Sequence, residues 1–368
     1  MNGNINVLMV GSSTKVKGGM TTVVQSFLQH EFNSPIKISY IATHTEKGDI
    51  YNFLFFVQSL GRIFFHLLFK NPLLVHLHMS ERGSFVRKYI IFRLAKLFGK
   101  KVIIHTHGAE FKEYFMSSSP MMKKKIMGLL KNADRVLVLG ESWEMILRSI
   151  EPEAKTTILM NSVPIPVIDS SKRRQKDFHL LFLAVLIERK GILDLIEASV
   201  LPIMQAKKNN LRLIFHIAGD GELMEAAKKR VSEYNFEEFF HFYGWVNESQ
   251  KKKLLKLADL FILPSYNEGL PMSILEALSY GIPVISTKVG SIDEAIVDGV
   301  NGYLIEPGDI HALSMRISEL AATQSLMSMR QASRKIAEEK FGNEQYFKEM
   351  EKIYLKNLME SSEKAVQK

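Results

Sequence analysis

Short runs of β-branched and large apolar residues alternate along this chain with longer stretches of helical periodicity. In the first half the short runs are INVLMVG, LLVHLHM, KVIIHTH and RVLVLG, and a helical pattern follows most of them. Strands that alternate with helices form parallel sheets with helices on both faces. The alternation therefore predicts an α/β fold built from a doubly wound parallel sheet.

The alternation pauses once and then starts again. SVPIPVIDSSKRRQKDF, residues 162 to 178, is rich in Pro, Ser and charge, and strand-like runs such as HLLFLAVL, LRLIFHIAG and ADLFILPS follow it. A chain of 368 residues is also longer than a single core usually serves, roughly 250 to 300 residues. We expect two Rossmann-like domains, at 1–165 and 179–340, a linker at 166–178, and a C-terminal helix at 341–368 that packs back on the first domain.

In doubly wound sheets, ligands bind at the carboxyl ends of the strands where the strand order reverses. With two such sheets facing each other, the cleft between them is the expected active site.

The formal charge of +9 is distributed unevenly. Residues 1–170 contain 21 Lys and Arg against 12 Asp and Glu, which leaves 27 of each kind in the remainder of the 48 basic and 39 acidic residues. A basic first domain indicates an anionic partner, such as a phosphorylated substrate or an acidic membrane face. Nucleic acid is not expected, because the basic residues accompany no recognised reading module.

The absence of Cys excludes disulfides, thiolate nucleophiles and Cys-ligated zinc. The N-terminal stretch MNGNINVLMVGSS has no basic region ahead of its apolar run, so no secretory signal is expected. A cytoplasmic location is the resulting expectation.

The most hydrophobic segment is YNFLFFVQSLGRIFFHLLF, residues 51 to 69. Gln58, Gly61, Arg62 and His66 interrupt it, so it is a poor candidate for a membrane span, which needs about 20 nearly uninterrupted apolar residues. It is either a buried core helix or a helix that lies in a membrane interface. The mixed basic and apolar stretches at 86–101 and 121–131 favour a surface that touches lipid.

The segment EGLPMSILEALSYG contains two carboxylates, Glu268 and Glu276. Pro271 suits the first position of a helix and Gly281 suits the left-handed residue that ends one, so we expect a helix over 271–280. Its amino end would attract an anion such as a diphosphate. Glu276 could hold both hydroxyls of a ribose, although from spacing alone it could equally be a solvent-facing helix residue.

Residues 258–309, which include both carboxylates, resemble the signature of family 4 of the retaining, nucleotide-sugar-dependent glycosyltransferases with the GT-B fold. This resemblance implies that Glu276 binds the donor ribose and that Glu268 contacts the transferred sugar as a catalytic residue. It also implies donor contacts from the turn and the helix start, at Gly269, Leu270 and Met272.

IERKGILDLIEA, residues 187 to 198, resembles the family segment in which a Lys before a Gly meets the donor diphosphate. Lys190 takes that place, and a cation there would stabilise the charge that develops on the leaving phosphate. The family usually has an Arg five residues earlier, whereas this chain has Val185 after Ala184. Arg189 is the candidate to replace it in donor binding.

Three other segments carry implied site residues. Gly18 and Gly19 form a loop that approaches the donor phosphates in the family, and Val246 lies where backbone groups would read the base. His107 matches the family His near the reacting sugar and is the second catalytic candidate. Glu110 is the candidate for acceptor binding, with a helix-cap role as the alternative.

His76, His78, His105 and His107 form two His-x-His pairs. Such pairs can indicate zinc, but zinc sites need further ligands in a defined shell. The resembled family uses no catalytic metal, so we expect neither a metal nor another cofactor besides the nucleoside diphosphate sugar.

Taken together, the sequence indicates a retaining hexosyltransferase that moves a sugar from a nucleoside diphosphate donor to an acceptor. A lipid-linked saccharide of bacterial surface polysaccharide assembly suits a basic, apolar first domain, with peripheral contact at the inner face of the cell membrane. Two alternatives stay open at this point: a nucleotide-sugar epimerase of the same architecture, and a non-catalytic partner of another transferase.

Overall fold

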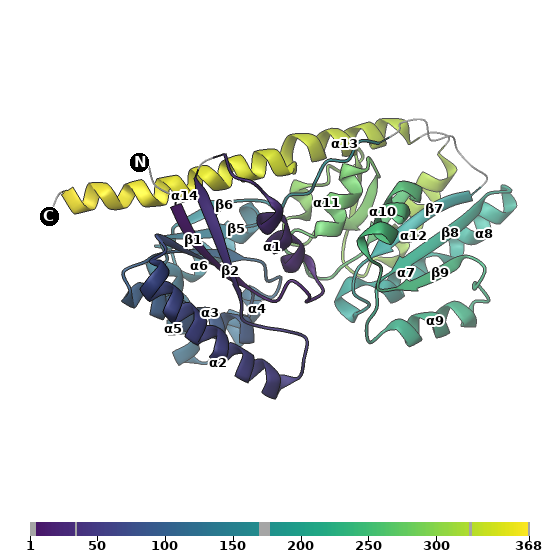
Figure 1. Cartoon of the computed structure of the whole chain (residues 1–368). Helices are drawn as coiled ribbons and strands as arrows, with labels where there is room; N and C mark the ends of the chain where they lie inside the picture. Colours follow the sequence, from purple (N-terminus) through teal and green to yellow (C-terminus); the bar gives the residue numbers. More distant parts are fainter. Residues whose placement is uncertain (1–4, 34, 169–176, 324–325, 367–368) are drawn as a thin grey trace. The chain divides into compact units, whose positions relative to one another are not determined.

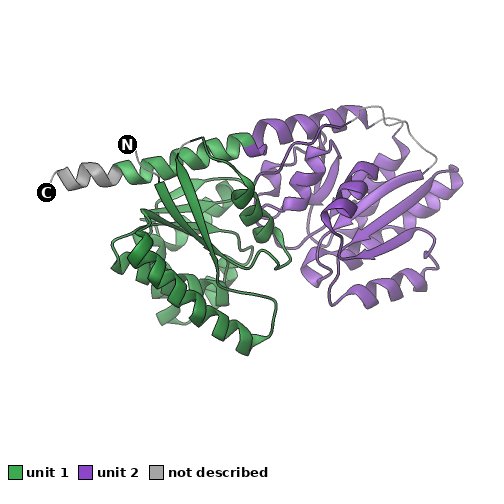
Figure 2. Ribbon diagram, viewed as in Figure 1, with its two compact units in different colours: residues 1–161, 344–368 green, residues 162–343 purple. Residues whose placement is uncertain are grey.

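The computed structural model describes residues 5–33, 35–168, 177–323 and 326–366 (Figure 1). The chain forms two compact units (Figure 2). Unit 1 comprises Met1–Asn161 and Glu344–Lys368, and unit 2 comprises Ser162–Asn343. Most of the expected linker, 169–176, lies outside the described residues, and the flanking residues 162–168 and 177–178 belong to unit 2.

Unit 1 contains a six-stranded parallel sheet with the strand order β2-β1-β3-β4-β5-β6. Its strands are β1 (Ile5–Gly11), β2 (Ile36–Ala42), β3 (Leu74–Met79), β4 (Lys101–Thr106), β5 (Arg135–Val138) and β6 (Thr156–Ile158). Its helices are α1 (Gly19–Gln29), α2 (Asp49–Phe65), a π-helical turn η1 (His66–Lys70), α3 (Gly83–Leu97), α4 (Phe111–Ser117), α5 (Pro120–Asn132), α6 (Glu141–Ile150) and α14 (Asn343–Val366).

Unit 2 contains a second six-stranded parallel sheet, with the order β12-β11-β10-β7-β8-β9. Its strands are β7 (Asp177–Leu183), β8 (Arg212–Ala218), β9 (Phe240–Gly244), β10 (Leu260–Leu263), β11 (Val284–Thr287) and β12 (Gly302–Ile305). Its helical segments are η2 (Glu188–Lys190), α7 (Ile192–Ala198), α8 (Val200–Lys208), α9 (Met224–Glu233), α10 (Glu248–Leu257), α11 (Met272–Ser279), η3 (Ile292–Glu294), α12 (Ile310–Ala322) and α13 (Met327–Lys340).

Both sheets are doubly wound, which confirms the expected fold class. The strand order reverses between β1 and β3 in unit 1 and between β7 and β10 in unit 2. Helices cover both faces of each sheet, so the inner strands are buried on both sides; in β3 and β10, for example, every residue is buried. The two reversal points are the positions where the loops after neighbouring strands diverge and leave room for a ligand.

Helix α14 follows unit 2 in the sequence but packs in unit 1. Its Tyr354 is fully buried, and the hydroxyl lies 2.7 Å from Nδ1 of His76 on β3. Phe347, also on α14, meets the ring of Phe27 on α1 edge to face, at 5.2 Å between centroids. These buried aromatic contacts join the two helices to the β3 face of the sheet.

The apolar segment at 51–69 forms α2 and continues through η1. Only Ser59, Ile63 and Leu67 are buried, and the Ser59 hydroxyl donates to the carbonyl of Ala42 at the end of β2. Most of the large apolar side chains are exposed: Ile50, Tyr51, Phe53, Leu54, Val57, Phe64, Phe65, Leu68 and Phe69. The interpretation of this segment as a buried core helix is therefore wrong, except for the side of the helix that carries Ser59, Ile63 and Leu67.

The helical stretch Asp49–Lys70 is also long and apolar enough, by length and composition alone, to cross a membrane. From the sequence, a membrane span is not expected, because Gln58, Gly61, Arg62 and His66 interrupt the apolar run. One such helix is weak evidence of a span, and the buried stripe with its hydrogen bond to β2 makes the helix part of unit 1.

We predict that Tyr354→Phe lowers the free energy of unfolding by about 1 to 3 kcal/mol, because it leaves a ring nitrogen of His76 buried without its partner. Tyr346→Phe is the matched control. Its hydroxyl is on the same helix, is also buried, and has no hydrogen-bond partner in the described part of the chain, so its removal should cost little. Denaturant unfolding of both variants measures the difference, and equal losses would contradict the role given to the Tyr354 hydroxyl.

Candidate active site

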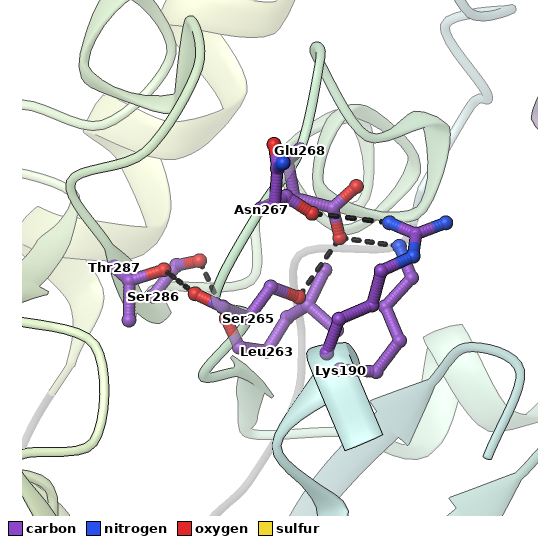
Figure 3. Close-up of polar contacts among 8 residues, drawn as sticks. Lys190, Leu263, Ser265, Asn267, Glu268, Ser286 and Thr287 are labelled. Atoms are coloured by element: carbon purple, nitrogen blue, oxygen red, sulfur yellow. Dashed lines mark hydrogen bonds and ion pairs between the residues drawn. The ribbon is translucent and has the colours of Figure 1, made fainter. Parts of the chain in front are cut away.

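Glu268 and Lys190 meet at the strand-order reversal of unit 2. Lys190 ends the loop after β7, Glu268 lies in the turn after β10, and the Lys190 ammonium forms an ion pair with Oε1 of Glu268 (Figure 3). The Ser265 hydroxyl donates to the same oxygen, at 2.8 Å. Both charged side chains are largely buried, with 12% and 6% of the side-chain surface exposed. The two residues implied for donor binding and catalysis are thus in direct contact.

Two glycines allow this turn to pack closely. A Cβ at Gly191, whose φ is +70°, would lie 2.2 Å from the carbonyl oxygen of Pro264. A Cβ at Gly290, whose φ is +59°, would lie 2.1 Å from the carbonyl oxygen of Glu268. Any side chain there would push the turn away, so glycine is required at both positions.

Arg189 holds the backbone of the same turn. Its Nη1 donates to the carbonyl of Asn267 at 3.1 Å, and its own carbonyl accepts from the Tyr266 amide at 2.8 Å. Val185, at the place of the family arginine, is half-buried in the loop after β7. Arg189 therefore adds a second cation beside Lys190, and the pKa of Lys190 is lowered by burial, with Glu268 opposing and Arg189 reinforcing that shift.

Helix α11 begins at the turn, as expected, but one residue later than the sequence suggests. Pro271 is the N-cap with ψ of 126°, and the helix runs from Met272 to Ser279. The Pro271 carbonyl accepts hydrogen bonds from the first turn of the helix, while the backbone of Pro271 itself is extended. Pro271 is therefore the residue before the helix and not its first member. Gly281 takes the expected left-handed conformation, with φ of +65°.

The remaining donor candidates in this segment, Gly269, Leu270 and Met272, lie in the turn and at the start of α11. Leu270 and Met272 are buried, and the Gly269 carbonyl accepts from the amide of Ser291 at 2.9 Å. These contacts fix the amino end of α11, whose first N–H groups lack an intrahelical acceptor. An anion placed there would meet both those groups and the positive end of the helix dipole.

Glu276 lies one turn further along α11 and has a cationic partner that sequence reasoning missed. Lys251 on α10 donates to its Oε1 at 2.6 Å, and both side chains are about 15% exposed or less. Burial raises the pKa of Glu276, with Lys251 opposing this shift. In the sequence, Lys251 opens the run KKK and reads as part of a solvated helix face, so only the fold reveals the pair.

Val246 lies between β9 and α10, in the loop that leads to Lys251. The neighbouring Gly219 and Gly244 pair through their backbones, with the Gly219 amide 2.9 Å from the Gly244 carbonyl. At Gly219 a Cβ would lie 1.8 Å from the carbonyl oxygen of Ala184. The loops after β7, β8 and β9 therefore pack tightly, and Val246 is half-buried beside them.

In unit 1, Gly18 and Gly19 lie after β1, as expected. Gly18 is the N-cap of α1 with φ of 137°, a conformation that favours glycine, and Gly19 is the first helical residue. Glu110 is the N-cap residue of α4, where its side chain makes no capping hydrogen bond. Its carboxylate instead pairs with Arg82 at 3.2 Å, so the helix-cap alternative is wrong for the side chain.

His107 follows β4 and contacts a row of histidines. Its Nε2 lies 2.9 Å from Nδ1 of His78, and burial lowers the pKa of His107 to about 3. The imidazole is therefore neutral near pH 7, and it can exchange hydrogen bonds with a sugar hydroxyl but contributes no positive charge.

His76, His78 and His105 offer nitrogens within 4.8 Å of one another, a set that could hold a metal ion. Their rings, however, are stacked or tilted by only 8° to 32° relative to one another. A shared ion would have to lie near the plane of every ring, where the lone pairs point. Phe27 also faces all three ring edges, at 78° to 79°. We interpret the cluster as an aromatic stack.

We predict that Lys190→Met destabilises unit 2 by about 3 to 5 kcal/mol, because it leaves the Glu268 carboxylate buried without its cation. The double variant Lys190→Met, Glu268→Gln should recover part of this loss. Unfolding free energies of the two single variants and the double variant form a double-mutant cycle. Strictly additive losses would show that the two side chains do not interact.

Known proteins resemble this chain in sequence and in structure. The family model described as "Glycosyl transferases group 1" matches residues 167–340, which hold all of the unit 2 candidates. Two relatives are the Escherichia coli UDP-Gal:alpha-D-GlcNAc-diphosphoundecaprenol alpha-1,3-galactosyltransferase and the Erwinia amylovora amylovoran biosynthesis glycosyltransferase AmsK. They are 29% and 26% identical to this chain, over 64% and 66% of its length and 63% and 60% of their own.

Solved structures are similar over nearly the whole chain. A sucrose-phosphate synthase from Thermosynechococcus elongatus has a TM-score of 0.75 at 17% identity, covering 95% of this chain and 98% of that one. Anabaena Alr3699/HepE, solved with UDP and glucose, has a TM-score of 0.72 at 17% identity, covering 95% and 99%. Residues 167–340 thus match the group 1 glycosyltransferases, and the two units have the GT-B fold.

Proposed function

We propose that this glycosyltransferase is retaining and that it transfers a sugar from a nucleoside diphosphate sugar to a lipid-linked saccharide in surface polysaccharide assembly. Binding of the donor is supported by the arrangement at the strand-order reversal between β7 and β10. The cations Lys190 and Arg189 lie there beside the amino end of α11, and the turn and the helix carry the buried carboxylates Glu268 and Glu276. The relatives support the acceptor half, since one of them is named for a diphosphoundecaprenol acceptor.

The donor diphosphate would bind at the amino end of α11, beside Lys190 and Arg189. Cleavage of the sugar–phosphate bond leaves new negative charge on the departing phosphate, and fixed cations and N–H groups stabilise that charge as it develops. The protein itself supplies this positive charge, so we propose that the reaction needs no metal cofactor. Glu268, held against Lys190, would then face the transferred sugar.

Glu276 would accept hydrogen bonds from the donor ribose. Its ion pair with Lys251 offsets part of the cost of burying the carboxylate, and an ionised carboxylate accepts two hydroxyl donors at once. His107, neutral and hydrogen-bonded to His78, would bond a hydroxyl of the reacting sugar. Retention without an enzyme nucleophile requires the acceptor to attack from the face that the phosphate leaves, with the phosphate taking the proton.

The acceptor and the membrane would meet unit 1. The exposed apolar side of α2 and η1 is flanked by exposed cations, Lys47, Arg62 and Lys70. An apolar helix face bordered by basic residues suits the headgroup boundary of an anionic bilayer, where both kinds of side chain gain favourable contacts. We therefore propose peripheral binding of a cytoplasmic protein to the inner membrane face.

Donor binding is tested by thermal shift with a panel of nucleoside diphosphate sugars. A ligand at a hundred times its dissociation constant stabilises the folded state by about 2.7 kcal/mol. Glu276→Ala should abolish the shift. Glu248→Ala is the matched control, since Glu248 is an exposed carboxylate that also pairs with Lys251, at 2.7 Å, and the shift should persist. An undiminished shift in Glu276→Ala would contradict the ribose assignment.

Product analysis by NMR then separates the reaction classes. A transferase releases nucleoside diphosphate and forms a glycoside with the donor's anomeric configuration when the acceptor is present. An epimerase converts the nucleotide sugar with no acceptor, and a non-catalytic partner gives no turnover as a purified chain. An inverted glycoside would contradict retention.

Membrane binding is tested with vesicles that contain phosphatidylglycerol. Phe65→Ser, Phe69→Ser removes two stacked, exposed rings and should weaken binding at least tenfold, about 1.4 kcal/mol. Leu201→Ser, Met204→Ser removes two exposed apolar residues from α8 and should have little effect. Binding should also fall as salt increases and be weaker to neutral phosphatidylcholine vesicles. Equal binding of both double variants would rule out α2 as the contact.

A further inference from the structure

Lys88 on α3 is fully buried, and no carboxylate pairs with it among the described residues. Its ammonium donates to the hydroxyl of Thr43, at 3.0 Å. Burial, and after it the charge of the neighbouring Arg87, lowers the pKa of Lys88 to about 7. A buried amine without an acidic partner is costly to keep charged, and a bound anion would stabilise its charged form.

Arg87 is a second cation at this place, and no ion pair joins it to a carboxylate among the described residues. Its guanidinium reaches back toward the start of α3, with Nη1 3.3 Å from the position of a Cβ on Gly83. Nε of Arg87 is buried and makes no hydrogen bond within the described residues, and burial lowers the Arg87 pKa. The residue as a whole is half-buried.

His44 is the third member of the cluster. It follows β2, it is half-buried, and its pKa is lowered by burial and then by the charges of Arg87 and Lys88, with Glu46 opposing. His44 directly follows Thr43, whose hydroxyl accepts from Lys88, so it lies near that cation although it comes from another element. Arg87 and Lys88 disfavour the protonated form of His44. A bound anion would stabilise that form.

The cluster lies at the strand-order reversal of unit 1. The amide and the hydroxyl of Thr43 both donate to the Gly11 carbonyl, each at 2.9 Å, and the Ser13 amide donates to the His44 carbonyl at 2.8 Å. The loops after β1 and β2 are thus tied together, and Lys88 reaches them from the helix that follows β3. This edge is where doubly wound sheets bind ligands.

We propose that Arg87, His44 and Lys88 form an anion site in unit 1 that binds the diphosphate group of the acceptor, an assignment that rests on the proposed function. Arg87 and His44 would donate hydrogen bonds to phosphate oxygens. Lys88 would act from behind Thr43, through its charge, because the interior of the protein screens that charge weakly.

The acceptor diphosphate suits this site better than the donor diphosphate. The donor has its own cations in unit 2, Lys190 and Arg189, at the corresponding sheet edge. The site also differs from a membrane contact, since Lys88 is buried and Arg87 half-buried, while lipid headgroups meet exposed residues such as those flanking α2. The diphosphate group of a single prenyl-linked molecule can reach the half-buried Arg87, whereas the flat surface of a bilayer cannot.

The test uses farnesyl diphosphate as the probe, in calorimetry on the full chain, with farnesol and UDP as comparison ligands. Lys88→Met and Arg87→Gln should each weaken farnesyl diphosphate binding about tenfold to a hundredfold, the effect of losing one charge-assisted contact. Arg93→Gln, which removes an exposed charge from the same helix, should change it less than about twofold. UDP binding should be the same in all four proteins, and farnesol should not bind at this site.

A second readout follows from the low pKa of Lys88. At pH 8 the free amine is mostly neutral, and a bound anion raises its pKa, so binding takes up a proton. Calorimetry in two buffers of different ionisation enthalpy measures this uptake. His44, His78, Glu46 and Arg87 also face the group, so the uptake assigned to Lys88 is the part that Lys88→Met removes.

The outcomes separate the two proposals. If wild type and the Lys88 and Arg87 variants bind farnesyl diphosphate equally while UDP binds normally, the anion site is overturned and the proposed function stands. If the two variants lose UDP binding as well, the site serves the donor and the acceptor assignment is overturned. If wild type binds no nucleotide, the proposed function itself fails. Thermal unfolding confirms that each variant is folded.

Discussion

The contact between Lys190 and Glu268 is the constraint on which the arrangement of unit 2 depends. The two residues belong to loops 78 positions apart in sequence, and only the reversal of strand order between β7 and β10 brings those loops together. Glycine at 191 and 290 lets the backbones approach, and Ser265 and Arg189 hold the turn from either side. Because the pair is almost completely buried, neither charge is tolerated without the other.

The two sheet edges use positive charge in different ways. In unit 2, Lys190 and Lys251 each have a carboxylate partner, so the charges of these two lysines are offset before a ligand arrives. In unit 1, the described residues offer no carboxylate to Lys88 or Arg87, and the excess of basic residues lies in the same half of the sequence. An anion would therefore change the local electrostatics more in unit 1 than in unit 2.

Much of the architecture could be predicted from the sequence because its signals are local. Strand runs, the helix after Pro271 and the left-handed Gly281 each depend on a few neighbouring residues. The exposure of α2 could not be predicted, since a helix with apolar residues on every side looks the same in a core and on a surface. The partner of Glu276 and the pairing of Lys88 with Thr43 depend on contacts between distant segments, and a lone lysine in a sequence resembles any solvated lysine. Glu268 and Lys190 were found through family resemblance, which supplies the distant information that spacing lacks.

The position of α14 has a consequence for how the protein is made. Tyr354 and Phe347 complete the core of unit 1, yet a ribosome produces them only after all of unit 2. Until then, Phe27 and the histidine face of β3 have no cover from this helix, and a nascent unit 1 would expose them. Final closure of the first domain is therefore a late, post-translational event, and a chain that terminates early would lose the first domain's core before it lost the second's.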